Sequence, residues 1–174
     1  MEQKLHTPEG VRDIYNRECE TKLTLQQKLS TVLHLYGYQD IQSPTFEYDD
    51  VFRKEIGSTS TKELYRFFDR EGNILALRPD ITPSVARAAA TLFEGEDLPI
   101  RLCYIGNTFI NHSSYQGRLK ENTQMGAELI GLDSVEADAE MIAMVVDGLK
   151  KTGLTEFQVN IGHIDFIQSL LEST

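Results

Sequence analysis

The strongest constraint on the fold comes from residues 101–131, where two strand-like stretches flank a polar loop. The first stretch covers residues 101–110 and the second covers residues 124–131. The loop between them, residues 111–120, contains two serines, a glycine and two cations. Side chains of a strand alternate between the two faces of its sheet, and the second stretch follows this alternation. The pattern predicts two strands joined by a long polar loop.

The second predicted strand has one polar face, formed by Gln124, Gly126 and Glu128, and one apolar face. An antiparallel sheet often presents such a polar face to solvent, which is the simplest interpretation. The alternative is the floor of a polar pocket. There, the carboxylate of Glu128 and the amide of Gln124 would bind a small cationic or amine ligand. Periodicity alone leaves both interpretations open.

Helical spacing of apolar residues predicts helices over about residues 17–36, over residues 85–93 and between Ser134 and Gly153. Gly37 and Gly153 follow two of these helices, where a left-handed backbone commonly ends a helix. A last helix is expected to start near residue 162.

Further strands are predicted by alternation at residues 38–42 and 157–161. Gly72 marks a hairpin between residues 64–69 and 73–78, whereas the run of serine and threonine at 58–61 reads as a loop. Strands in hairpins with helices before, between and after them indicate an α+β domain with a mainly antiparallel sheet flanked by helices.

Length and composition limit the class of protein. The 174 residues, 40% hydrophobic and 25% charged, suit one soluble globular domain. No apolar run approaches the roughly 20 residues that span a bilayer, and the N-terminus has no signal-peptide core. Two cysteines without metal-binding spacing favour a reduced, cytoplasmic setting. The net charge of −10 argues against a nucleic-acid surface on this part of the protein.

The region around the polar loop resembles motif 2 of the class II aminoacyl-tRNA synthetases, in its histidyl version. That version has a strand with Phe-Arg-x-Glu, a Gly-Arg loop, and a second strand ending in Gln-x-Gly-x-Glu-x-x-Gly. The features shared with it are residues 104–106, Phe109, Gly117, Arg118 and residues 124–131. The resemblance implies the catalytic-domain fold of that class.

Three family positions differ at the site of chemistry. The arginine that grips the ATP α-phosphate and the substrate carboxylate corresponds to Ile110, the motif glutamate to His112, and the adenine-stacking aromatic to Asn122. Isoleucine lacks the charged, bidentate fork that arginine gives a phosphate. Losing it is expected to cost adenylation several orders of magnitude. For Arg118, both a residual phosphate contact and a solvated cation stay open.

Residues 77–82, Leu-Arg-Pro-Asp-Ile-Thr, resemble the Leu-Arg-Pro-Glu-Gly-Thr segment of histidyl synthetases. There, the glutamate holds the substrate α-amino group, beside the threonine. Asp80 keeps the carboxylate on a shorter side chain. The resemblance therefore implies a histidine site formed by Asp80, Thr82, Gln124 and Glu128. A second interpretation is that Asp80 or Thr82 caps the helix that follows.

Residues 17–44 resemble motif 1, whose family role is dimerisation, so a homodimer through this region is expected. The resemblance covers nearly the whole chain, roughly residues 7–172, so residues 1–174 are expected to be one domain, the N-terminal part with motifs 1 and 2. Motif 3 and any C-terminal domain would lie beyond it. The chain closes in an amphipathic helix with no stop signal, which favours this interpretation.

Two groups of proteins share this scaffold. One is the histidyl-tRNA synthetases, which are ATP-dependent ligases. The other is the regulatory subunits of ATP phosphoribosyltransferase, which do not aminoacylate. They bind the short-form catalytic subunit and control the first step of histidine biosynthesis in response to histidine. Ile110, His112 and Asn122 favour the second group, which implies no catalytic residues, cofactor or metal. A scaffold domain that binds no ligand is the third alternative.

Overall fold

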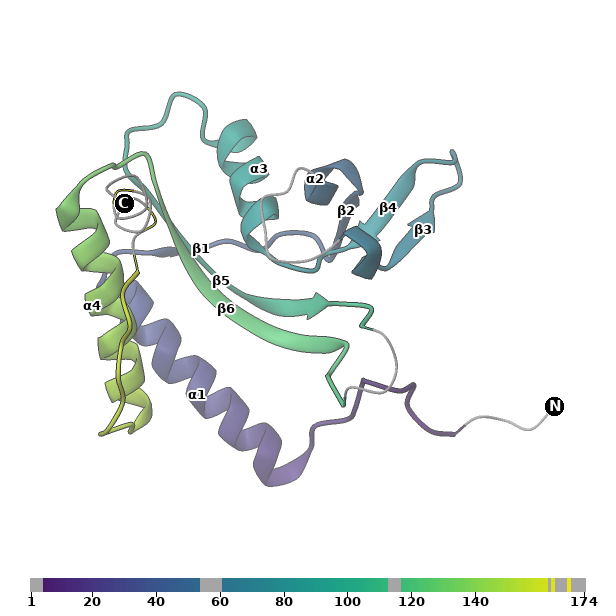
Figure 1. Cartoon of the computed structure of the whole chain (residues 1–174), viewed down its shortest axis with the longest axis horizontal. Coiled ribbons are helices and arrows are strands. Elements are labelled where there is room, and N and C mark those ends of the chain that lie inside the picture. The colour runs from purple at the N-terminus through teal and green to yellow at the C-terminus, as the bar shows by residue number, and fades with distance from the viewer. Residues whose placement is uncertain (1–4, 54–60, 113–116, 163, 165–168, 170–174) are drawn as a thin grey trace.

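The computed structural model describes residues 5–53, 61–112, 117–162, 164 and 169. A long sheet lies between two layers (Figure 1): α1 and α4 cover one face, and α3 with a second, smaller sheet lies on the other. The helices are α1 (Asn16–Leu35), α2 (Asp50–Arg53), η1 (Thr61–Glu63, a 3-10 turn), α3 (Thr82–Leu92) and α4 (Val135–Thr152).

The long sheet has the strand order β1-β5-β6. Its strands are β1 (Gln39–Asp40), β5 (Ile100–Phe109) and β6 (Glu121–Ile130). β5 and β6 are antiparallel over ten residue pairs, from Ile100 opposite Ile130 to Phe109 opposite Glu121. The predicted strand pair is therefore confirmed. β1 runs parallel to β5, with Asp40 opposite Cys103.

The apolar face of β6 packs against the two long helices, as its alternation predicts. Ala127 and Leu129 pack against a buried cluster drawn from α1, α4, β5 and the turn after α1. The buried members of this cluster are Val32, Tyr38, Cys103 and Met144. The opposite face of the sheet packs against α3 through a second cluster, formed by Ile81, Val85, Leu102 and Tyr104. The polar face of β6 therefore points toward α3.

The start of α4 and the C-terminal ends of α1 and α4 fall where their sequence signals predict. Ser134 caps α4, since its Oγ accepts from the backbone N–H of Ala137 at 3.2 Å. Gly153 ends α4 with a φ of 107°, and Lys150 and Lys151 lie in the last turn, where cations offset the negative end of the helix dipole. Gly37, with a φ of 84°, turns the chain after α1.

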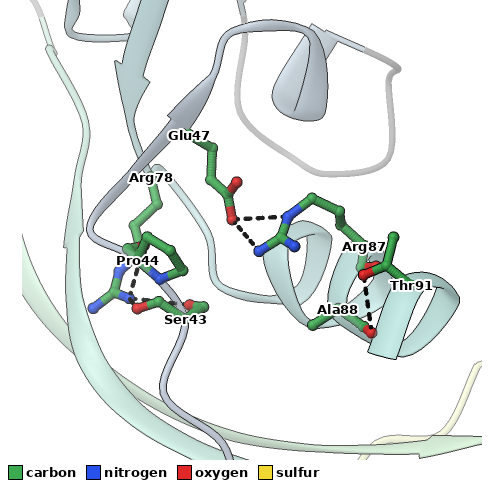
Figure 2. Close-up of polar contacts among 7 residues, drawn as sticks. All are labelled: Ser43, Pro44, Glu47, Arg78, Arg87, Ala88 and Thr91. Carbon is green, nitrogen blue, oxygen red and sulfur yellow. Dashed lines mark hydrogen bonds and ion pairs between the residues drawn. The ribbon is translucent and has the colours of Figure 1, made fainter. Parts of the chain in front are cut away.

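The smaller sheet has the order β2-β4-β3 and is antiparallel. Its strands are β2 (Phe46–Tyr48), β3 (Arg66–Phe68) and β4 (Ile74–Leu77). The predicted hairpin at Gly72 is confirmed, with a φ of 87°. Figure 2 shows how this sheet is tied to α3: both Nε and Nη2 of Arg87 donate to Glu47 Oε1, at 3.1 and 2.7 Å.

Three predictions need correction. Residues 157–161 form no strand, because no described strand pairs with them, and Ile161 is 73% exposed. The strand predicted at 38–42 is only two residues long. α3 starts at Thr82 rather than residue 85, since Pro83 suits the first turn of a helix.

Two predicted segments lie largely outside the described residues. Of the serine and threonine loop, residues 58–60 lie outside them and Thr61 begins η1; most of the last helix also lies outside them, although residues 164 and 169 are helical. Among the helices described, none combines the length and apolar character needed to cross a bilayer.

Candidate ligand-binding site

The candidate site lies between the polar face of β6 and the N-terminal end of α3. The strand register places Glu128 opposite Leu102, Gly126 opposite Tyr104, and Gln124 opposite Gly106. Asp80, in the segment that joins β4 to α3, and Thr82, the first residue of α3, approach this face. The structure therefore brings together all four residues that the sequence predicts for ligand binding, although they come from segments more than 40 residues apart.

Asp80 and Gln124 form the first half of a hydrogen-bond network. Gln124 Nε2 donates to Asp80 Oδ1 at 2.9 Å, and Gln124 Oε1 accepts from the backbone N–H of Ile81 at 3.2 Å. Asp80 Oδ1 also accepts from the backbone N–H of Thr82 at 3.2 Å. Asp80 therefore contacts both the first residue of α3 and β6, whereas the N-cap position itself is Ile81 and has no side-chain cap bond, so neither Asp80 nor Thr82 is the predicted cap.

Thr82 and Glu128 form the second half. Thr82 Oγ1 donates to Glu128 Oε1 at 2.7 Å, and the Tyr104 hydroxyl donates to the same oxygen at 3.1 Å. The two hydroxyls lie 3.2 Å apart. Burial raises the pKa of Tyr104 to about 12, so the phenol keeps its proton at neutral pH and can act as a donor.

Tyr104 is the site residue that sequence reasoning missed. It lies on β5 directly opposite Gly126, and its side chain occupies the space that a residue 126 side chain would fill. A Cβ built on Gly126 would overlap the phenol ring of Tyr104. The pattern Gln-x-Gly-x-Glu carries a signal for this arrangement, since a glycine inside a strand often marks the close approach of another group.

The solvent-face interpretation of β6 is wrong. Gln124 and Glu128 are partly buried: Gln124 bonds to the segment before α3, and Glu128 bonds to Thr82 on α3 and Tyr104 on β5. Two carboxylates, an amide and two hydroxyls converge here from three elements. Carboxylates favour a positively charged partner, and amide and hydroxyl groups fix its orientation. The arrangement is suited to an ammonium group or another small cationic ligand.

The three positions that depart from the synthetase pattern make contacts within the β5–β6 pair or with η1. The backbone N–H of Ile110 donates to the Lys120 carbonyl at 2.9 Å, and Asn122 Nδ2 donates to the Leu119 carbonyl at 3.2 Å. His112 Nδ1 lies 3.1 Å from Glu63 Oε1 on η1. None of these three side chains supplies a guanidinium for a phosphate.

Arg118 lies apart from the four ligand-binding candidates. It is exposed, and no contact described for it joins it to Asp80, Thr82, Gln124 or Glu128. Its predicted phosphate contact remains a prediction.

Arg78 has a different role from the exposed cations. It is only 7% exposed, and Figure 2 shows its guanidinium against Ser43 and Pro44. Its Nη1 donates to the Ser43 carbonyl at 2.8 Å, and its Nε donates to the Asn107 carbonyl at 2.8 Å. Burial lowers the pKa of this guanidinium. Arg78 therefore fixes the segment that carries Asp80 against β5 and against the chain before β2.

With this geometry in place, similarity to known proteins identifies the family. Residues 10–174 match the family model described as histidyl-tRNA synthetase. The chain belongs to the histidyl-tRNA synthetase family. This agrees with the resemblance found in motifs 1 and 2 and with the α+β fold.

Individual relatives of this family fall into two groups. The chain is 43% identical to an ATP phosphoribosyltransferase regulatory subunit from Acetivibrio thermocellus, over 99% of the chain and 41% of that relative. A crystal structure titled as an ATP phosphoribosyltransferase regulatory subunit/histidyl-tRNA synthetase, from Bacillus halodurans C, matches with a TM-score of 0.89. It is 34% identical, over 99% of the chain and 45% of that structure.

The second group is represented by apo S. aureus histidyl-tRNA synthetase, which matches with a TM-score of 0.72 and 28% identity, over 87% of the chain and 35% of that structure. The chain spans less than half the length of each of these three relatives. Its similarity to proteins named ATP phosphoribosyltransferase regulatory subunit extends over nearly all of its own residues.

Proposed function

We propose that the chain is the N-terminal part of a non-catalytic regulatory subunit of ATP phosphoribosyltransferase, the enzyme of the first step of histidine biosynthesis. The observation that carries the proposal is Ile110, which stands where the synthetase pattern has its ATP-binding arginine. His112 and Asn122 add two further losses at the same end of the strand pair. The relatives named as regulatory subunits support the same assignment.

Within this proposal, histidine binds over Gln124 and Glu128, and its α-amino group lies near Asp80 and Thr82. The support is the network itself, which gathers both carboxylates and the amide between α3 and β6. The bonds that Asp80 and Glu128 now make to Gln124 and Thr82 would be partly exchanged for bonds to the ligand. A charged ammonium is a stronger partner for a carboxylate than a neutral amide or hydroxyl.

Histidine would then control assembly or activity with the short-form catalytic subunit. A ligand shifts such an equilibrium only through different affinities for its two states, so the site must differ between the free and the assembled protein. The segment that joins β4 to α3 is suited to this role. It carries Asp80 and is anchored by Arg78 to two other parts of the fold.

The proposal includes a homodimer through residues 17–44 and a cytoplasmic setting. The support for the dimer is the resemblance of residues 17–44 to motif 1.

The second candidate is histidyl-tRNA synthetase activity. It is favoured by the four residues that match the amino-acid-binding positions of the synthetases: Asp80, Thr82, Gln124 and Glu128. Histidine-dependent ATP–pyrophosphate exchange by the complete protein separates the two functions, with the S. aureus enzyme as the positive control. We expect no exchange from the complete protein. Exchange at a rate comparable with the control would establish the synthetase and reject the regulatory proposal.

A further inference from the structure

Three side chains with metal-ligating atoms converge at the C-terminal end of α1. His34 lies in the last turn of α1, Asp40 on β1 and Cys103 on β5. Gly37 turns the chain between α1 and β1, and the parallel pairing then sets Asp40 opposite Cys103. The backbone N–H of Ile41 donates to the Cys103 carbonyl at 2.8 Å, which fixes the two strands at this point.

The distances between the donor atoms are close to those of a metal site. His34 Nε2 lies 3.0 Å from Asp40 Oδ2, and Cys103 Sγ lies 3.5 Å from Asp40 Oδ1. One donor atom from each of the three residues lies within 4.8 Å of the other two. A tetrahedral zinc site, from its bond lengths, separates such atoms by about 3.3–3.6 Å. The two short distances involve different oxygens of Asp40, so its carboxylate would turn to direct one oxygen at the shared ion.

The donor set indicates which kind of ion would bind. It offers one imidazole nitrogen, one carboxylate oxygen and one thiolate sulfur, which is the mixture that zinc accepts. Calcium and magnesium require mainly oxygen donors and find only one carboxylate here. Within the part of the chain that the structure describes, no other three histidine, cysteine or acidic side chains have this spacing.

The exposure of the three residues leaves room for an ion to enter. Cys103 is buried, whereas the side chains of His34 and Asp40 are 46 and 66% exposed. The sulfur therefore forms the inner wall, and the two exposed ligands can rotate around an ion that arrives from solvent. An ion held in this way would keep a fourth position open to water.

We propose that His34, Asp40 and Cys103 form a binding site for one divalent transition-metal ion of the zinc type, with water as the fourth ligand. On binding, the Cys103 thiol loses its proton to solvent, and the thiolate, the neutral His34 imidazole and the Asp40 carboxylate coordinate the ion. The ion would join the end of α1 to β1 and β5. This site is separate from the ligand-binding candidates and does not rest on the regulatory role, although His34 and Asp40 belong to residues 17–44, the region proposed for the dimer.

Cobalt(II) is the probe of choice because its spectrum reports both sulfur ligation and geometry. The full chain, treated with a chelator and kept reduced, is titrated with Co²⁺. We expect one equivalent to bind with a near-ultraviolet thiolate-to-cobalt charge-transfer band and the visible bands of a four-coordinate site. Zn²⁺ should displace the cobalt and remove both features. Absence of the charge-transfer band would overturn the proposal.

The variants assign the ligands. Cys103→Ala should abolish the charge-transfer band, whereas Cys19→Ala, the matched control at the only other cysteine, should keep it. His34→Ala and Asp40→Ala change exposed side chains, and each should weaken Co²⁺ binding at least tenfold while far-ultraviolet circular dichroism stays unchanged. If Cys103→Ala does not fold, the Co²⁺ affinities of these two variants decide whether the metal site exists. Unchanged affinity in both would reject the site.

Discussion

The Tyr104 hydroxyl lies 3.1 Å from Glu128 Oε1, and the Tyr104 ring occupies the space left open by Gly126 on the neighbouring strand. This relationship explains why a glycine separates the two polar side chains of β6. Glu128 is held from two sides, by Tyr104 and by Thr82, so its carboxylate has a fixed position before any ligand binds. Fixed groups of this kind lower the cost of ordering a site when the ligand arrives.

Replacing Gly126 with alanine should disturb this packing. The added Cβ would overlap the Tyr104 ring, and an overpacked core typically loses about 1–3 kcal/mol of unfolding free energy. Urea denaturation followed by circular dichroism measures the loss. Gly162→Ala is the control, since among the described residues other than its chain neighbours no heavy atom lies within 4 Å of a Cβ at that position. Equal stability of Gly126→Ala and Gly162→Ala would contradict the packing described here.

Replacing Glu128 with glutamine should weaken histidine binding at least tenfold, because the neutral amide lacks the charge that attracts an ammonium group. Isothermal titration calorimetry measures the affinity. Glu121→Gln is the matched control, since Glu121 lies on the same strand but points to the other face, where it accepts from Asn107 Nδ2 at 2.7 Å. A histidine affinity unchanged by Glu128→Gln would place the histidine site elsewhere.

Replacing Arg78 with lysine should destabilise the fold by about 1–3 kcal/mol, since lysine cannot reach the Ser43 and Asn107 carbonyls together and leaves a part-buried acceptor unpaired. The midpoint of urea unfolding gives the change. Arg70→Lys, on the exposed hairpin turn, is the control and should alter the midpoint little. If both substitutions had the same small effect, Arg78 would not be the anchor of the segment that carries Asp80.

Stability should fall at high pH through two buried tyrosines. Burial raises the pKa of both Tyr38 and Tyr104 to about 12, whereas an unfolded tyrosine titrates near about 10. Between these values the folded state binds more protons than the unfolded state. The stabilisation that each protonated tyrosine gives the folded state is therefore complete below about pH 10. It is lost as the pH rises to about 12, which lowers the free energy of unfolding by about 1–3 kcal/mol for each residue.

Tyrosinate absorbance measures these titrations directly. Of the seven tyrosines, Tyr38 and Tyr104 should contribute most of a late phase, and the Tyr38→Phe, Tyr104→Phe double variant should lose that part; Tyr36, whose pKa is raised by its hydrogen bond to Asp147, can keep a smaller share. Tyr48→Phe, at a residue 59% exposed, should leave the late phase intact. A double variant that keeps the whole late phase would show that other tyrosines are responsible for it.

Much of the fold could be predicted from local patterns. The alternation from Gln124 to Leu129 assigned the two faces of β6, and Ser134 and Gly153 marked the ends of α4. The start of α3 was missed because Thr82, Pro83 and Ser84 are not a helical apolar pattern. Residues 157–161 show that alternation alone does not make a strand when no partner is present among the described residues.

The contents of the two sites could be predicted only in part. The four ligand-binding candidates came from family motifs. Tyr104 can be assigned to the site only when the register between β5 and β6 is known. A slip of one residue would turn it to the other face, and the loop pattern does not fix that register. The group of His34, Asp40 and Cys103 depends on a parallel pairing between strands 63 residues apart, which no local spacing records.

Phosphoribosyl transfer by a short-form ATP phosphoribosyltransferase catalytic subunit tests the central claim most directly. The catalytic subunit is assayed alone, with the complete protein that contains this chain, and with that protein plus histidine. The regulatory assignment predicts activation by the added protein, reversal by histidine, and co-elution of the two proteins. Lack of activation together with lack of co-elution would contradict it and favour the synthetase despite Ile110.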